Sequence, residues 1–261
     1  MDIETRKKTK SHVTKEDIKN GLKKLGLKRG DNVGVHSSLG AFGYVEGGAD
    51  AVIDALLETV GEDGTVVMPT YSNNIESLEK TQEEMDMGIT WKYKVLPYDP
   101  QKDNCWTGKI PDTFWRRNGA IRNSHPTHSL TAMGAKADEF SYADNNWKKL
   151  MMMDGYILLL GATLACCSSM HLAEEHIKLP QHILDRITPP PDLAEKYRRE
   201  KIGFGYGPYP DFGKMEEICI KHGIMKTVKI GETTVKLLRL RELIDLYAEY
   251  LQKDPDLFYH N

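Results

Sequence analysis

The segment Tyr156–Leu160 constrains the fold most, because a short run of apolar residues predicts a strand buried in a sheet. Gly161 ends this run, and a short polar loop then leads to His171 and Glu174 at the start of an expected helix. Two residues at that spacing share one helical face and can interact. Because ligands bind at the carboxyl ends of strands in such sheets, we expect a functional site here.

Other segments alternate between helical and strand patterns. Thr14 and Asp17 form a helix-capping pattern, and Gly26 can end the helix that follows. Further helices are expected at 49–60, 212–222 and 240–251, strands at 32–36 and 65–69, and a hairpin at 227–230 and 233–238. This alternation predicts an α/β fold with a central mostly parallel or mixed sheet flanked by helices.

The stretch 71–117 differs from its surroundings. It is polar, carries Trp91, Trp106 and Trp115, and has little periodicity. We expect a long irregular insertion within one domain that spans 1–261. Long irregular segments of this kind are either binding loops or surface insertions, and both interpretations stay open.

Composition limits the class of partner and the compartment. A net charge of -3 gives no general attraction to nucleic acid or to an anionic membrane. The four cysteines, at 105, 166, 167 and 219, include no CxxC pair, which suits a reducing cytosol. The N-terminus lacks the apolar core of a secretory signal, and no run reaches the roughly 20 apolar residues of a membrane span. We expect a cytoplasmic protein.

His171 and Glu174 allow several functional interpretations. They could be a general base with its orienting carboxylate, or a zinc pair completed by a ligand such as His222. A structural histidine is a third possibility. The nearby Cys166, Cys167 and Ser168 allow an acyl-enzyme, although the GxSxG elbow is missing. His176 follows at a spacing that does not fit the HExxH zinc motif, and we predict no metal.

Two polar runs could bind a phosphate group. His36, Ser37, Ser38 and Leu39 follow an expected strand, where hydroxyls and backbone N–H groups can hold an anion. The same residues are also common in plain turns. The run 122–129 contains Arg122, which could clamp a phosphate, but it could equally be a hydrogen-bonded loop. The chain has no GxxxxGK[ST] and no GxGxxG motif.

Several segments, taken in order, resemble the aminoglycoside 3-N-acetyltransferase family, which is distinct from the GNAT acetyltransferases. The resemblance covers roughly residues 14 to 251. The matching segments are 35–39, 45–49, 63–70, 108–117, 122–129 with Ala132 and Gly134, 158–161, and 171–174. The family implies an antibiotic N-acetyltransferase-like fold and direct transfer of acetyl from acetyl-CoA, as co-substrate, to a small-molecule amine.

The resemblance also implies roles for particular residues. His171 would take the proton from the attacking amine, Glu174 would orient the imidazole, and Ser168 would donate to the developing oxyanion. The residues that the resemblance places at CoA are His36, Ser37, Ser38, Leu39, Ile110, Arg122, Ser124 and Ser129. Asp211 and Tyr71 would face the amine. We expect a monomer or a homodimer without nucleic-acid or membrane partners.

The loop 163–167 departs from the family pattern. Family members usually carry acidic and small polar residues there, whereas this chain has Thr163, Leu164 and Ala165 followed by two cysteines. The leading acceptor is the 3-amino group of an aminoglycoside, which would mean a role in antibiotic resistance. The alternatives are a family member that acts on another amine and a zinc-dependent hydrolase built on His171 and Glu174.

Overall fold

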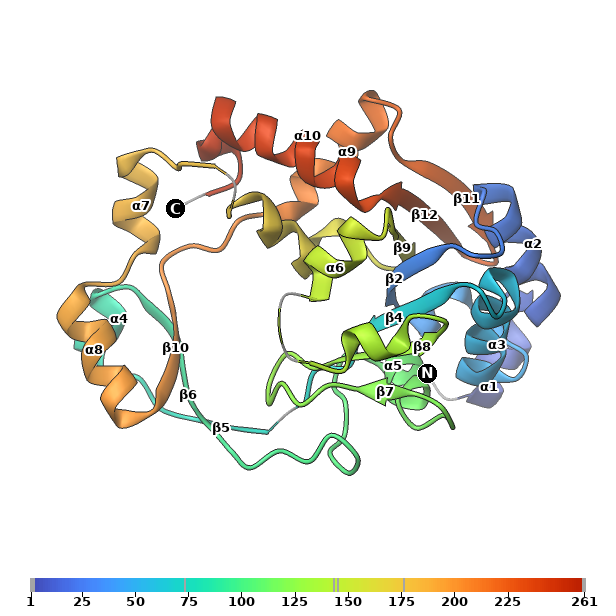
Figure 1. Ribbon diagram of the computed structural model, residues 1–261, viewed down its shortest axis with the longest axis horizontal. Coiled ribbons are helices and arrows are strands. Elements are labelled where there is room, and N and C mark those ends of the chain that lie inside the picture. The colour runs from blue at the N-terminus through green and yellow to red at the C-terminus, as the bar shows by residue number, and fades with distance from the viewer. Residues whose placement is uncertain (1–2, 73, 143, 145, 176, 260–261) are drawn as a thin grey trace.

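A mixed sheet forms the centre of the computed structural model, which describes residues 3–72, 74–142, 144, 146–175 and 177–259. Its seven strands have the order β11-β12-β9-β2-β4-β8-β7 (Figure 1). They are β2 (Asn32–Ser37), β4 (Thr65–Pro69), β7 (Ile121–Arg122), β8 (Leu130–Gly134), β9 (Tyr156–Leu160), β11 (Lys226–Ile230) and β12 (Thr233–Arg239). β9, β2 and β4 are parallel, whereas the outer strands on both sides pair antiparallel. The predicted α/β class with a mixed sheet is confirmed.

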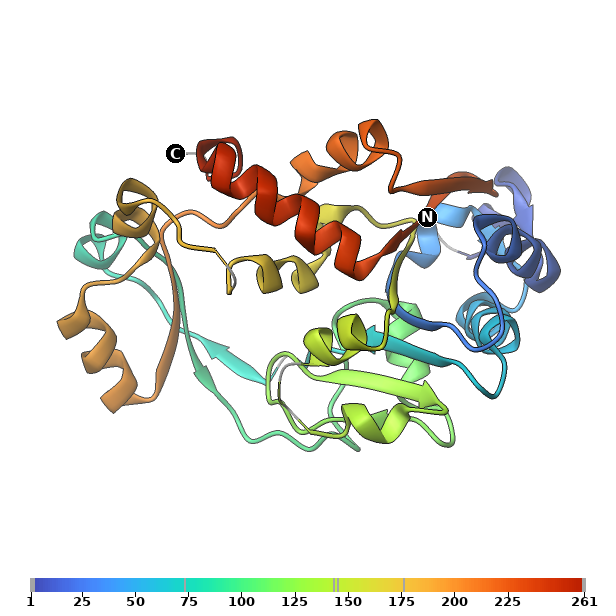
Figure 2. The ribbon, with the colours of Figure 1, turned by 45° about the horizontal axis from the view of Figure 1, so that its top comes forward.

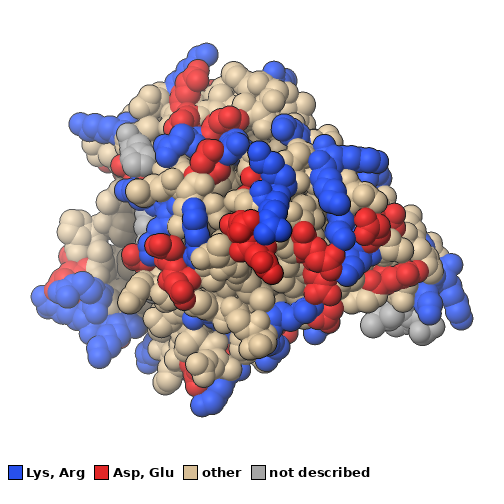
Figure 3. All heavy atoms as spheres, turned by 45° about the vertical axis from the view of Figure 1, so that its right-hand side comes forward, with Lys and Arg blue, Asp and Glu red and all other residues tan. Residues whose placement is uncertain are grey.

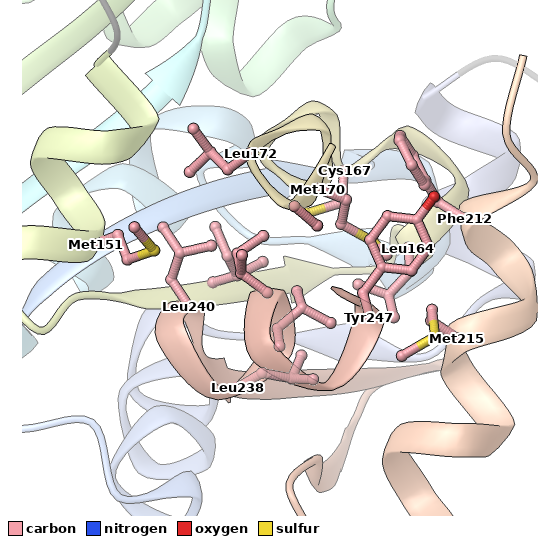
Figure 4. Close-up of a cluster of buried hydrophobic side chains, with 14 of the residues drawn as sticks. Met151, Leu164, Cys167, Met170, Leu172, Phe212, Met215, Leu238, Leu240 and Tyr247 are labelled. Atoms are coloured by element: carbon pink, nitrogen blue, oxygen red, sulfur yellow. The ribbon is translucent and has the colours of Figure 1, made fainter. Parts of the chain in front are cut away.

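Helices cover both faces of this sheet (Figures 1 and 2). One face packs against α2 (Lys15–Leu25), α3 (Gly48–Val60) and α5 (Lys109–Phe114). The other face packs against α6 (Asn146–Met152), α9 (Met215–Lys221) and α10 (Leu240–Lys253). Alternate residues of β9 enter the two cores, since Leu158 and Leu160 face the first set of helices and Ile157 and Leu159 face the second. Figure 4 shows the second core around Tyr247 of α10.

The local patterns of the sequence are realised at several element ends. Thr14 caps α2 with a reciprocal bond to Asp17, and Gly26 ends that helix with φ 97°. The expected hairpin is β11 and β12, and the expected final helix is α10. The expected helix at 212–222 is a 3₁₀ turn, η5 (Phe212–Lys214), that continues into α9.

The segment 71–117 contains more regular structure than the sequence predicts. It holds β5 (Ile75–Ser77), α4 (Gln82–Asp86), β6 (Ile89–Val95) and α5. β6 pairs antiparallel with β5 and with β10 (Ile202–Tyr206), which comes much later in the chain. This small sheet packs on α8 (Pro191–Glu200) through a core of its own. Its polar strands have no periodicity that identifies them alone, because β6 is stabilised by pairing with a distant segment.

The remaining elements are short. They are α1 (Ile3–Thr9), β1 (His12–Val13), β3 (Tyr44–Val45), α7 (Gln181–Ile187), and the 3₁₀ helices η1 (Leu39–Phe42), η2 (Ala137–Phe140), η3 (Leu164–Cys166), η4 (Ser168–Ala173) and η6 (Pro255–Leu257). Within the described residues, no helix has the length and apolar character that crossing a membrane requires. Positive and negative side chains are interspersed on the face in Figure 3, which agrees with the small net charge.

A buried ion pair holds the small sheet to its helices. The carboxylate of Glu84 in α4 accepts bonds from Nζ of Lys92 in β6 at 2.8 and 2.7 Å, and another from Oη of Tyr197 in α8. The side chains of Glu84 and Lys92 are each 11% exposed. Lys92, with Tyr197, lowers the pKa of Glu84 from 4.5 to about 2.

Replacing Glu84 by glutamine should lower the free energy of unfolding by about 2 kcal/mol at pH 7, since Lys92 stays buried without a charged partner. The folded pKa of Glu84 is depressed, so its contribution is complete above the unfolded value near 4.5 and is lost as the pH falls toward 2. Urea denaturation at pH 7 and pH 3 measures both effects. The exposed neighbour Glu83, changed to Gln, is the matched control. An equal loss at both pH values would contradict the prediction.

Candidate functional site

The carboxyl ends of the three parallel strands meet at one pocket. β2 ends at Ser37 opposite Leu160, the last residue of β9, and the backbone N–H of Ser38 donates to the carbonyl of Leu160 at 2.8 Å. The loops after β2, β4 and β9 enclose a volume of about 420 Å³, which we call the first pocket. Its lining is Val35, His36, Ser37, Ser38, Pro69, Tyr71, Trp106, Thr107, Pro111, Gly161, Ala162, Thr163 and Cys166.

Two polar side chains of the first pocket are left without partners. His36 is 6% exposed, its ring stacks on Trp147 with centroids 5.7 Å apart, and its Nε2 has no hydrogen-bond partner among the described residues. Oγ of Ser37 is likewise buried and unpaired within that part of the chain. Burial lowers the pKa of His36 to about 4, so the ring is neutral at physiological pH. Buried polar groups are usually satisfied, so these two atoms indicate a site for a polar ligand.

A second pocket of about 310 Å³ adjoins the first. Its lining is Tyr71, Asn123, His125, His128, Leu130, Asp144, Asn146, Trp147, Ser168 and His171. Tyr71 lines both pockets, and its hydroxyl is hydrogen-bonded to the hydroxyl of Ser168 at 2.6 Å. Nδ2 of Asn123 and Oδ1 of Asn146 are buried and unpaired among the described residues. The second pocket therefore offers both donors and acceptors to a ligand.

His171 and Glu174 are in contact, as the sequence predicts. Nδ1 of His171 lies 3.1 Å from Oε2 of Glu174. A carboxylate can only accept, so Nδ1 carries the proton and the lone pair of Nε2 is free for a ligand. The expected helix start is wrong in kind, because both residues lie at a 3₁₀ helix, η4, and its C-cap. Residues i and i+3 eclipse in that helix, which brings the two side chains together directly.

The surroundings of this pair fix its orientation. The edge of the His171 ring meets Phe212, with ring centroids 4.8 Å apart, and Phe212 packs on Tyr247 of α10. Glu174 is 24% exposed at its side chain. Burial, together with this carboxylate, raises the pKa of both Tyr247 and Tyr259. A negative charge held behind His171 favours the protonated form of its ring.

Other residues singled out from the sequence lie elsewhere. Leu39 and Ile110 pack into the core between the sheet and α2, α3 and α5. Ser124 is exposed and lines neither pocket. Asp211 accepts from the backbone N–H of Gly213 at 3.0 Å, which caps the turn that carries Phe212.

Arg122 and Ser129 support the loop after β4. The Arg122 guanidinium donates to the carbonyls of Thr70 at 2.6 Å and of Asp103, and it stacks on Trp115 at 4.7 Å. The Ser129 hydroxyl donates to the same Thr70 carbonyl at 2.6 Å. These contacts hold the loop that carries Tyr71, and neither Arg122 nor Ser129 lines the two pockets. Their expected contact with CoA stays a prediction.

Some lining residues had no signal in the sequence, and others had a partial one. Asn146 and Trp147 reach the second pocket from α6, and nothing in their local pattern marks them. His125 and His128 belong to the dense polar run, which was a usable signal. Nδ1 of His125 accepts from the backbone N–H of His128 at 2.9 Å, so this turn is held by a side chain that also faces the pocket.

The possible zinc ligand His222 lies at the C-terminal end of α9. Its Nε2 is hydrogen-bonded to the hydroxyl of Tyr250 at 3.0 Å, and it lines neither pocket. His176 lies outside the described residues. Within the described part, no cluster of three His, Cys, Asp or Glu side chains has a geometry that could hold a metal ion.

An α/β sheet with two adjoining pockets at the carboxyl ends of its strands defines an enzyme that acts on small molecules. Comparison with known families makes this class more specific. The family model "Aminoglycoside 3-N-acetyltransferase" matches residues 35–252, and the chain belongs to this family. It is therefore an acyltransferase of the aminoglycoside 3-N-acetyltransferase type.

Individual relatives agree with this assignment. The YokD protein of Bacillus subtilis, described as aminoglycoside N(3')-acetyltransferase-like, is 32% identical over 90% of this chain and 91% of its own length. Aminoglycoside N(3)-acetyltransferase IX of Micromonospora chalcea is 35% identical, over 62% of each chain. Among solved structures, aminoglycoside acetyltransferase AAC(3)-IVa superposes with a TM-score of 0.74 at 23% identity, over 97% of this chain and 94% of that one.

Because burial keeps His36 neutral, its ring protons should not shift between pH 8 and pH 5 in NMR spectra, and they should titrate near pH 4. The unfolded ring takes up a proton near 6.5, so the free energy of unfolding should fall as the pH drops from about 6.5 toward 4. The spectrum of His36→Gln assigns the signals. A midpoint near 6.5 in the folded protein would contradict this prediction.

Proposed function

We propose that this chain is an acetyl-CoA-dependent N-acetyltransferase whose leading acceptor is the 3-amino group of an aminoglycoside. The observation that carries the proposal is the His171–Glu174 pair, which borders a pocket that adjoins a second pocket through Tyr71. A two-substrate transfer needs two such neighbouring sites, with a proton acceptor beside the point where the substrates meet.

The first pocket suits the arm of acetyl-CoA, which supplies an activated acetyl group as a thioester. That arm is long and carries amide groups, which need polar partners along an otherwise apolar channel. Nε2 of His36 and Oγ of Ser37 are unpaired within the described chain and can serve them. Ser38 adds a hydroxyl at the mouth of this pocket. A solved family structure at 24% identity, titled AAC-IIIb, is a binary complex with CoASH, which supports the assignment.

The second pocket suits the amine. Its carboxylate and amide oxygens, from Asp144 and Asn146, can attract an ammonium group before it loses its proton. Nε2 of His171 then accepts that proton, while the carboxylate of Glu174 stabilises the charged ring from the Nδ1 side. Solved family structures whose titles give a bound gentamicin, apramycin or sisomicin support an aminoglycoside as the acceptor.

Ser168 and Tyr71 lie where the two pockets meet. Their hydroxyls form one hydrogen bond, so one of the two can donate a further bond to an acyl oxygen held between the pockets. A donor aimed at a developing negative charge contributes strongly to acyl transfer. We assign this role to Ser168, with Tyr71 as the residue that positions it.

The unusual loop 163–167 bears on the CoA side of the proposed reaction. Thr163 and Cys166 line the first pocket and are absent from the lining of the second. The departure from the family pattern therefore gives no steric reason to reject an aminoglycoside. An amine of another class remains the alternative, and only activity on a panel of amines separates the two.

We expect thiol release from acetyl-CoA when the purified chain meets an aminoglycoside with a free 3-amino group, such as gentamicin or sisomicin. Simple alkylamines should give little release, since they lack the additional cationic groups that the second pocket and its rim can hold. A thiol-detecting assay across both sets of amines, with mass spectrometry of the products, measures this. Release with simple amines alone would favour the alternative acceptor, and CoA binding without release for any amine would contradict the proposal.

Replacing His171 by alanine should lower kcat at least about 100-fold, the lower end of a general-base contribution, and should leave the affinity for CoA unchanged. The matched control is His222→Ala, which removes a histidine that is hydrogen-bonded to Tyr250 away from both pockets. Steady-state kinetics and calorimetry with CoA supply the two readouts. Unchanged turnover in the His171 variant would remove this residue from the mechanism.

A further inference from the structure

Cys166 differs from the other cysteines of the chain in its surroundings. It is exposed and lines the first pocket, and its Sγ donates to the carbonyl of Thr163 at 3.0 Å. Cys167 and Cys219 are fully buried in the core. Cys105 is half-buried, bonds to the hydroxyl of Thr107 at 2.8 Å and lines neither pocket.

The pocket that Cys166 lines has independent marks of a ligand site. His36 is only 6% exposed, and its unpaired Nε2 belongs to the same lining. Oγ of Ser37 is a second unpaired polar atom there, within the described residues. Under the proposed function this pocket receives an arm that ends in sulfur. A protein thiol and a ligand sulfur would then share one confined space.

We propose that Cys166 is a redox modification site, at which CoA disulfide forms a mixed disulfide with the enzyme and thereby closes the first pocket. This inference rests on the proposed function, because it takes the first pocket as the CoA site.

The chemistry is a thiol–disulfide exchange. The Cys166 thiol loses its proton to solvent, and its sulfur forms a bond to one sulfur of CoA disulfide. The original sulfur–sulfur bond breaks, and the other half leaves as CoA thiolate, which takes up a proton. The oxidising equivalents come from the CoA disulfide, so no further oxidant is needed. The tethered arm then occupies the space that acetyl-CoA requires, and a reducing thiol reverses the block.

Selectivity would come from binding rather than from a reactive thiol. Burial raises the pKa of the Cys166 thiol, so little of it is thiolate at neutral pH and a small disulfide should react slowly. A disulfide held in the pocket by its CoA portion gains from the high effective concentration of a bound reactant. CoA disulfide should therefore react faster than glutathione disulfide, and excess acetyl-CoA should protect the thiol.

The full chain is incubated at pH 8 with CoA disulfide or with glutathione disulfide, and intact-mass spectra and thiol-release activity are followed over time. We expect one CoA per chain, a rate at least about tenfold above that with glutathione disulfide, a loss of activity in proportion to the adduct, and recovery with dithiothreitol. Acetyl-CoA should slow the reaction.

Two variants locate the adduct. Cys166→Ser should gain no CoA, and incubation should not change its activity from its own starting value. Cys105→Ser, the matched control, should be modified like the parent chain. An adduct on Cys166→Ser, none on Cys105→Ser, or equal rates with both disulfides would overturn the inference. Calorimetry with CoA on the untreated chain separates the two proposals. Binding without any adduct overturns this inference alone, whereas absence of binding overturns the proposed function as well.

Discussion

The pairing of β2 with β9 is the constraint on which the site depends. The register sets Ser37 opposite Leu160, so the loops that follow both strands start side by side. Gly161 makes this approach possible, because with φ 72° a Cβ at this position would lie 2.5 Å from Cβ of Ala41. One loop brings the unpaired polar atoms of the first pocket, and the other brings Cys166 and, further on, His171. A shift of this register by one residue would exchange the two faces of the strand and separate these groups.

The His171–Glu174 pair is positioned by the core beneath it rather than by long regular secondary structure. Met170, Leu172 and Ala173, which flank His171 in η4, are buried and pack toward α10. Figure 4 shows Met170 and Leu172 in the same cluster as Phe212 and Tyr247. Apolar anchoring of the residues between two functional side chains fixes their rotamers, and it explains how a short 3₁₀ segment can hold a catalytic geometry.

The sequence predicts the central elements well, because their signals are local. The cap at Thr14, the apolar run of β9 and the turn between β11 and β12 each depend on a few neighbouring residues. It also predicts the contact of His171 with Glu174, although not the 3₁₀ helix. The small sheet could not be predicted, since β6 pairs with β10 across a long stretch of chain. For the same reason, Trp147 and the structural bonds of Arg122 emerge only from the folded chain.

Tyr71 is a partition between two compartments, because it belongs to the lining of both pockets and its hydroxyl is tied to Ser168. Any displacement of this partition by an occupant on one side changes the volume left on the other. Communication of this kind is reciprocal by thermodynamic necessity, so each substrate would alter the affinity of its partner by the same factor. In a transferase built this way, a single aromatic side chain sets the cooperativity between donor and acceptor.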